Sequence, residues 1–167
     1  YNSDGTLDTS FGGNGFAAFD VNAGSHDFPW GIALQADGKI LQAGHDNTTK
    51  DVVVVRWSSN GTVDTSFGGG SGYVQFDPGL GTSNHIMHDI HIQDDGKLVL
   101  TGRGTGAGFY DIITMRLNAD GSLDTSFGGG NGAVVTPIGA NSEYATDSVV
   151  MPDGKIRLPG IGEICVQ

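Results

Sequence analysis

The chain has 167 residues, including 29 glycines, and its 8 Lys and Arg against 19 Asp and Glu give a net charge of −11. This length suits one domain. The acidic balance argues against a nucleic-acid partner, since phosphate binding needs a basic face. No apolar run approaches the roughly 20 residues of a membrane span, so no membrane insertion is expected. Cys165 is the only cysteine, which excludes an internal disulfide framework and a Cys-x-x-Cys metal site.

A six-residue motif, DTSFGG, occurs three times along the chain, at residues 8–13, 64–69 and 124–129. A second motif, Asp-Gly-Lys followed by Ile or Leu, comes after each of them and starts at residues 37, 95 and 153. Because two motifs keep the same order through three copies, the chain is interpreted as one array of three repeats. The repeats are approximately 1–56, 57–116 and 117–167.

Each repeat predicts four strands and no helix. In the first copy the strands are expected at residues 15–21, 30–35, 39–44 and 51–57. Asp37-Gly38, between two apolar runs, indicates a tight hairpin, because both residues can adopt positive φ. The continuous apolar run Val52–Val55 predicts a strand covered on both faces. Residues 72–77 and 132–136 correspond to the first strand of the later copies, and residues 163–167 to the fourth strand of the third copy.

Four antiparallel strands in a unit of this length are typical of a propeller blade. The expected fold class is therefore all-β, a β-propeller-like array of three four-stranded antiparallel blades. A β-solenoid would have shorter coils, and a β-sandwich would not repeat its sequence.

The run LDTSFGGNG, followed by ALQADGKILQAG and VVVVRW, resembles the delta-60 repeat of bacterial secreted and surface proteins. The resemblance covers nearly the whole chain. It implies a propeller-type fold and an extracellular or cell-surface location. It implies no particular activity.

Three blades are fewer than the four or more of a closed propeller. The chain starts and stops at the same point of the repeat, so two blade faces are expected to be exposed. Two copies could close a six-bladed ring as a homodimer. The alternative is that the chain is a fragment and that further blades of a longer parent chain complete the ring.

Aspartates of the turn motifs are candidate calcium ligands. The pattern Asn-x-Asp-Gly-x-x-Asp in the first and third copies partly resembles a calcium loop, with Asp4, Asp8, Asp120 and Asp124 as ligands. The alternative is a structural turn in which each Asp accepts from backbone N–H groups. In that interpretation the repeat motif is structural in every copy, through Asp8, Phe11, Asp64, Phe67, Asp124 and Phe127. No cofactor other than calcium is expected.

The second copy holds a dense cluster of possible ligands. On a regular strand His85, Asp89 and His91 would share one face, whereas His88 would point away with Ile90 and Ile92. Such a set could bind zinc or serve as the catalytic residues of a hydrolase or lyase acting on a polysaccharide at the propeller mouth. The chain has no G-x-S-x-G elbow and no P-loop.

Aromatic residues with polar neighbours predict a sugar site, because a ring face packs on a sugar and polar groups bind its hydroxyls. The candidates are Trp30, His26, Asp27 and Tyr144. The leading hypothesis is a bacterial extracellular propeller module for binding or scaffolding, without catalysis, whose partner is a glycan. The enzyme is the first alternative, and a purely structural assembly subunit is the second.

Overall fold

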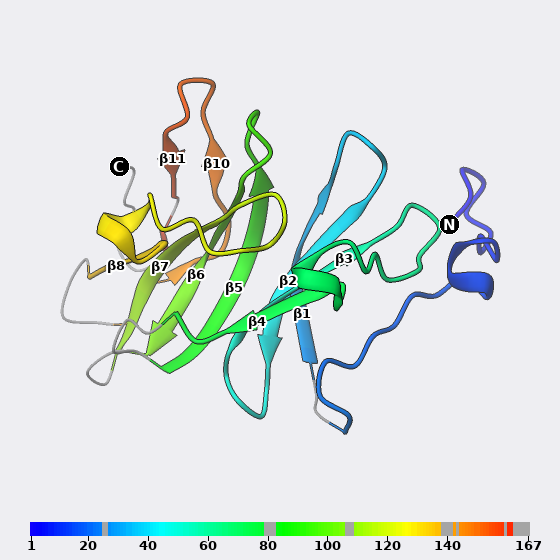
Figure 1. The fold of residues 1–167 in the computed structure, drawn as a ribbon, viewed down its shortest axis with the longest axis horizontal. Coiled ribbons are helices and arrows are strands. Elements are labelled where there is room, and N and C mark those ends of the chain that lie inside the picture. The colour runs from blue at the N-terminus through cyan, green and yellow to red at the C-terminus, as the bar shows by residue number, and fades with distance from the viewer. Residues whose placement is uncertain are drawn as a thin grey trace.

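The computed structural model describes residues 1–24, 27–78, 83–105, 109–137, 142, 144–158 and 160–161. Within this part of the chain the regular structure is antiparallel sheet, as Figure 1 shows, with three short 3-10 turns. These turns are η1 (Phe11–Gly13), η2 (Gly68–Gly70) and η3 (Gly128–Gly130), one at the end of each DTSFGG motif. None of the described helices is long and apolar enough to cross a membrane. The all-β prediction is confirmed.

The first sheet has four strands in chain order, with every neighbouring pair antiparallel. They are β1 (Asp27–Leu34), β2 (Ile40–Asp46), β3 (Val52–Trp57) and β4 (Tyr73–Phe76). The predicted hairpin joins the first two strands: Gly38 has a φ of 83°, and its N–H donates to the carbonyl of Gln35 at 2.9 Å. β3 is buried along its whole length, as its apolar run predicted.

The second sheet repeats the first strand for strand. It contains β5 (Ser83–Ile92), β6 (Leu98–Thr105), β7 (Tyr110–Leu117) and β8 (Ala133–Thr136), again in chain order and antiparallel. The same hairpin joins β5 to β6, with Gly96 donating to the carbonyl of Gln93 at 2.8 Å.

The strand after each DTSFGG motif closes the preceding sheet, which corrects the prediction that it opens a new one. β4 pairs with β3, and β8 pairs with β7 in the same way. The motif reverses the chain direction: Asp64 N–H donates to the carbonyl of Arg56, and Arg56 N–H donates to the carbonyl of Gly72. Each sheet therefore crosses a repeat boundary at residue 57 or 117, and its outer strand comes from the following copy.

Residues 15–21, which follow the DTSFGG motif of the first copy, also show that this segment needs a preceding strand to pair with. No β3-like strand precedes them in the described chain, and they form no strand. Their alternate side chains instead pack on one face of the first sheet, where Ala17, Phe19 and Val21 meet Val53, Val55 and Trp57.

The third copy is described mainly as its inner hairpin. β9 (Tyr144–Ala145) pairs with β12 (Gly160–Ile161), and β10 (Val149–Val150) pairs with β11 (Ile156–Arg157). These ladders correspond to the first two strands of the other sheets. The strand predicted at residues 163–167, with Cys165, lies outside the described residues.

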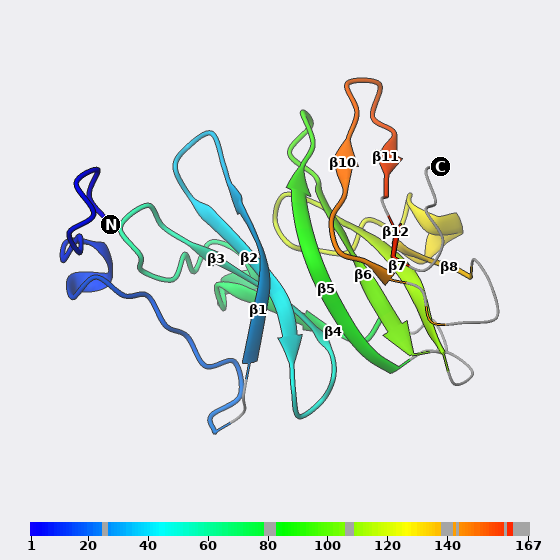
Figure 2. The same ribbon diagram turned by 180° about the vertical axis from the view of Figure 1, so that it is seen from behind.

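The first two sheets enclose the main hydrophobic core. In Figure 2 they stand face to face, with β5 beside β1 and β2. The core between them includes the fully buried side chains of Leu41, Phe67, Leu100 and Met115. At Gly31 a Cβ would lie 2.9 Å from the Cα of Asp89, so only glycine allows β1 and β5 to approach this closely.

Candidate functional site

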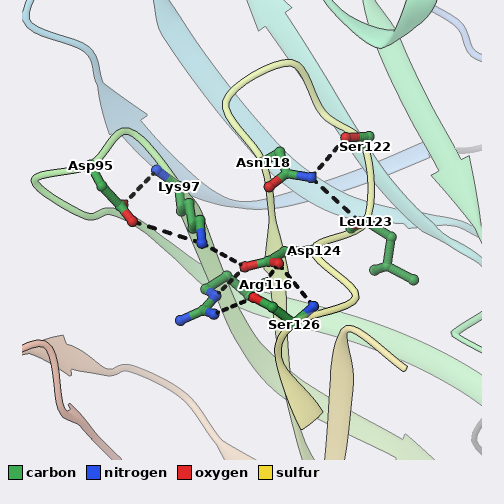
Figure 3. A network of polar contacts seen from close by, with 8 residues as sticks. All are labelled: Asp95, Lys97, Arg116, Asn118, Ser122, Leu123, Asp124 and Ser126. Carbon is green, nitrogen blue, oxygen red and sulfur yellow. Dashed lines mark hydrogen bonds and ion pairs between the residues drawn. The ribbon is translucent and has the colours of Figure 1, made fainter. Parts of the chain in front are cut away.

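The DTSFGG aspartates of the second and third copies hold charged networks. Figure 3 shows the third copy, where Arg116 Nε lies 2.7 Å and Lys97 Nζ 3.0 Å from Asp124 Oδ2. The other oxygen of Asp124 accepts from the N–H of Ser126 at 3.0 Å and from its hydroxyl at 2.6 Å. Hydrogen bonds from Ser126, followed by contacts with Lys97 and Arg116, hold the pKa of Asp124 well below its usual range. This carboxylate already has a full set of partners.

The other predicted calcium ligands each close a turn of their own. Asp4 accepts from the N–H and hydroxyl of Thr6, and Asp8 and Asp120 accept in the same way from the serines two residues on. These hydrogen bonds lower the pKa of all three carboxyl groups. The structural-turn alternative therefore describes their geometry, and calcium binding at these turns stays a prediction.

Both inner strands carry a β-bulge at the same place. The register of β1 against β2 shifts around Trp30, and the register of β5 against β6 shifts around His88. Each of these residues is left outside the ladder. A bulge re-aims the side chains next to it, and bulges are frequent beside binding sites.

The strand opposite each bulge has a glycine. A Cβ on Gly44 would lie 2.1 Å from the carbonyl oxygen of Phe28, and one on Gly102 would lie 2.0 Å from that of Ile86. The bulged strand therefore presses a carbonyl into the space that a side chain would need. A glycine is therefore required opposite the bulge in both repeats.

Five side chains from all three copies form a continuous row, which we call the ring row: Trp30, His88, Tyr144, Arg103 and Tyr110. The Trp30 and His88 rings stack with centroids 5.4 Å apart, and the His88 and Tyr144 centroids are 6.2 Å apart. The guanidinium carbon of Arg103 lies 5.2 Å from the ring centre of Tyr144 and 4.3 Å from that of Tyr110. Trp30, at one end of the row, is 56% exposed.

Buried polar atoms in and beside the ring row lack partners within the described chain. They are Nδ1 of His45, Nε2 of His88 and Nε of Arg103. The pKa of His45 is lowered by burial and by the cations of Lys50 and Arg103, and the pKa of His88 is lowered by burial, Arg103 and His45. Both imidazoles are therefore neutral at pH 7. Arg103 forms no ion pair with any described residue, and an unpaired buried polar group carries a free-energy cost that a bound water, ion or ligand would relieve.

A second cluster lies where β5 faces the third copy. His91 Nε2 is 2.9 Å from Asp89 Oδ2 and 2.5 Å from the carbonyl oxygen of Ser148. Ser148 donates its N–H and its hydroxyl to the same Asp89 oxygen, at 2.9 and 2.7 Å. The ligand atoms of Asp89, His91 and Asp147 lie within 4.8 Å of one another. Because the hydroxyl faces the carboxylate and not the imidazole, these groups do not form a Ser-His-Asp relay.

The structure brings together some predicted site residues and separates others. Trp30 and Tyr144 meet through His88, whereas the Asp27 carboxylate accepts from the N–H of Val21 at 2.9 Å, and His26 lies outside the described residues. Asp89 and His91 adjoin, as the shared-face prediction required.

His85 does not join Asp89 and His91. It is 2% exposed, and its Nδ1 lies 3.9 Å from the carboxylate of Asp77. The register of β5 shifts between Ser83 and Ile86 and again between Met87 and Asp89, so the regular alternation that placed His85 on the face of Asp89 does not hold.

Sequence reasoning missed His88, Arg103 and Asp147 as members of these clusters. A usable signal was present for His88. It occupies the place of Trp30 in the next copy, and the glycine opposite each of them is repeated as Gly44 and Gly102.

Repeated four-stranded antiparallel sheets, packed face to face, define a propeller-type repeat protein. Two stretches, residues 35–67 and 93–127, match a β-propeller family described as a domain of unknown function (DUF5122). The chain is similar to this family over these 33 and 35 residues, which run from the Asp-Gly-Lys hairpin to the DTSF motif in successive copies. No curated protein matches the chain. The propeller fold class predicted from the sequence is confirmed.

Proposed function

We propose that the chain is an extracellular bacterial propeller module that binds carbohydrate at the ring row without catalysing a reaction. The observation that carries this proposal is the contact of Trp30, His88 and Tyr144, which come from three different repeats. The resemblance to delta-60 repeats supports the bacterial and cell-surface setting.

The ring row offers the two kinds of contact that a sugar needs. The exposed ring of Trp30 supplies an apolar face for the C–H groups of a sugar. The neutral imidazole of His88 and the charged guanidinium of Arg103 are the polar groups of the row that would bind its hydroxyl groups. Side chains that are already packed lose little freedom on binding, which favours affinity.

Arg103 points to an acidic sugar. Its guanidinium lies against two tyrosine rings and has no carboxylate partner among the described residues, although the chain as a whole carries a charge of −11. A planar guanidinium binds a carboxylate with two parallel hydrogen bonds. A polysaccharide containing uronic acid is therefore the preferred ligand class.

The test compares binding of uronic-acid and neutral oligosaccharides by calorimetry. Trp30→Ala should abolish binding of both classes, whereas Arg103→Gln should weaken binding of the uronic-acid ligands more than binding of the neutral ones. Phe16→Ala is the matched control, because Phe16 is an aromatic residue with 64% exposure outside the ring row. If no oligosaccharide in a broad panel binds, the carbohydrate proposal is wrong.

An enzyme is the second candidate, favoured by the short contact between Asp89 and His91. A carboxylate and an imidazole at this distance can exchange a proton with a bound polymer, as a hydrolase or lyase requires. This candidate predicts cleavage of the polysaccharide that His91→Ala abolishes. Binding without cleavage by the unsubstituted chain would favour the module. A purely structural subunit would neither bind nor cleave the polysaccharide.

A further inference from the structure

Three possible metal ligands from two repeats meet where β5 of the second copy faces the third copy. They are Asp89, His91 and Asp147, which we call the Asp-His-Asp cluster. Their ligand atoms lie within 4.8 Å of one another. The zinc set expected from the sequence contained His85 in place of Asp147. The structure keeps two members of that set and brings the third from another copy.

The repeat explains why two carboxylates meet at this point. Asp89 and Asp147 stand at the same distance before the Asp-Gly-Lys motif of their copies, and Gly31 stands there in the first copy. Successive copies approach closely at this position, because a Cβ on Gly31 would lie 2.9 Å from the Cα of Asp89. The first copy contributes a glycine without a ligand atom. Among the described residues the cluster therefore forms only between the second and third copies.

The two carboxylates of the cluster lack a permanently charged partner. Within the described part of the chain neither Asp89 nor Asp147 forms an ion pair with a lysine or an arginine. The DTSFGG aspartates Asp64 and Asp124, by contrast, each pair with one lysine and one arginine. Two carboxylates this close repel each other, and a divalent cation between them would offset that repulsion.

His91 adds a nitrogen ligand aimed at the same point. Its Nε2 lies 2.9 Å from Asp89 Oδ2 and 2.5 Å from the carbonyl oxygen of Ser148. Two oxygen atoms this close to one ring nitrogen require a hydrogen or a cation between them. A neutral imidazole with carboxylate oxygens is a ligand set that suits zinc, whereas calcium and magnesium prefer oxygen ligands alone.

Ser148 holds Asp89 in a fixed orientation. The N–H and the hydroxyl of Ser148 donate to Asp89 Oδ2 at 2.9 and 2.7 Å, and Ser148 is only 5% exposed. Carboxylates that bind metal ions are typically oriented by hydrogen bonds of this kind. The side chain of Asp147 is exposed, so an ion can reach the cluster from solvent.

The cluster needs a small adjustment to hold a metal ion. Zinc lies about 2.0–2.2 Å from nitrogen and oxygen ligands, so tetrahedral ligand atoms are about 3.3–3.6 Å apart. Asp89 and His91, at 2.9 Å, would separate slightly. Asp147 would approach by a change of rotamer, which its exposure permits. Three protein ligands leave the fourth position to water.

We propose that the Asp-His-Asp cluster binds zinc and that the ion clamps the third copy to the second sheet. His91 supplies the nitrogen ligand, and Asp89 and Asp147 supply one oxygen each. The cluster shares no residue with the ring row, so the proposal is independent of carbohydrate binding. Zinc on His91 would occupy the nitrogen that faces Asp89, so its binding would count against proton exchange by this pair.

The test is a calorimetric titration of the chelator-treated chain with zinc chloride, together with thermal melts. The expected result is one zinc ion per chain. Because the ion binds the folded chain, the Tm should rise by roughly 5–10 °C at a free zinc concentration 100 times the dissociation constant. Calcium at the same concentration should not displace zinc. Absence of zinc binding, or binding without a rise in Tm, would overturn the proposal.

Two variants locate the ion. His91→Ala and Asp147→Ala each remove one ligand. Each should raise the dissociation constant for zinc at least roughly 100-fold, since loss of an outer hydrogen-bond partner alone costs about 10- to 100-fold. Because Asp147 is exposed, Asp147→Ala keeps the fold if His91→Ala does not. Asp153→Ala is the matched control, at an exposed aspartate of the same copy outside the cluster. Zinc affinity that Asp147→Ala leaves unchanged, or that Asp153→Ala lowers equally, would mean that the ion binds elsewhere on the acidic surface.

Discussion

The first and second copies of DTSFGG have identical residues and very different surroundings. The Asp64 carboxylate forms ion pairs with Arg56 and Lys39 at 2.8 and 3.2 Å, whereas the Asp8 carboxylate accepts from the N–H and hydroxyl of Ser10 and forms no ion pair within the described chain. Phe67 is fully buried, but Phe11 is only half-buried.

The comparison shows what the six residues do alone and what they need from elsewhere. The Asp–Ser hydrogen bonds form in both copies, so the turn is a local property. The cations come from elsewhere in the chain: Arg56 lies in the strand before the second motif, and Lys39 lies in the hairpin of the same sheet. Within the described residues the first motif has no such neighbours. Identical sequence therefore carries different amounts of stability in the two copies.

The largest expected effect is on the buried phenylalanine. Phe67→Ala should lower the free energy of unfolding by about 3–5 kcal/mol, because it leaves a cavity between two sheets. Phe11→Ala should cost about 1 kcal/mol, because the half-buried ring of Phe11 removes less apolar surface from water than a fully buried ring does. Urea denaturation measures both. Equal losses would mean that the two motifs are energetically equivalent. Phe67→Leu serves if the alanine variant does not fold.

The glycine turns allow a matched test of the contact between successive copies, in which the ring of Phe67 lies against the turn at Gly121. Gly5 and Gly121 have φ values of 85° and 92°, so alanine costs about 1 kcal/mol at either position through the backbone alone. Only at Gly121 would the new Cβ also meet the ring of Phe67. Gly121→Ala should therefore lose roughly 1–3 kcal/mol more than Gly5→Ala in the same denaturation experiment. Equal losses would contradict a stabilising contact between Phe67 and the turn at Gly121.

Replacing the motif aspartates by asparagine should again change stability by different amounts in the two copies. Hydrogen bonds from Ser66, with Lys39 and Arg56 beside it, hold the pKa of Asp64 far below its usual range. Its contribution to stability is present above pH of about 4 and is lost as the pH falls further. Asp64→Asn should therefore destabilise the chain at pH 7 by more than Asp8→Asn does, and the difference should shrink in acid. Thermal melts from pH 7 to pH 2 measure this, and a constant difference would exclude the charge as its cause.

The smallest expected effect concerns His45 and His88, whose side chains are removed from water. Burial lowers the pKa of His45 and His88, so the unfolded chain binds protons that the folded chain does not. Stability should fall as the pH drops from 7 towards 5. His45→Gln with His88→Gln should flatten this part of the pH profile. A profile unchanged by the double substitution would place its cause elsewhere.

Local sequence patterns predicted much of this structure. The Asp-Gly hairpins, the Asp turns and the buried strand at Val52–Val55 all follow from conformational preferences within a few residues. The motif spacing predicted a threefold all-β repeat. It could do so because each copy folds through the same local contacts. One candidate pair, Asp89 and His91, also adjoins as strand alternation required.

Tertiary structure decided the features that depend on partners distant in the chain. Which sheet a strand joins is set by pairing across the DTSFGG turn, so β4 could not be assigned from its own residues. The bulges at Trp30 and His88 form only when two strands pair with unequal numbers of residues, and they change which side chains share a face. The ring row needs three repeats in contact. The sequence by itself therefore determined the repeating unit, while packing between the units determined the candidate site.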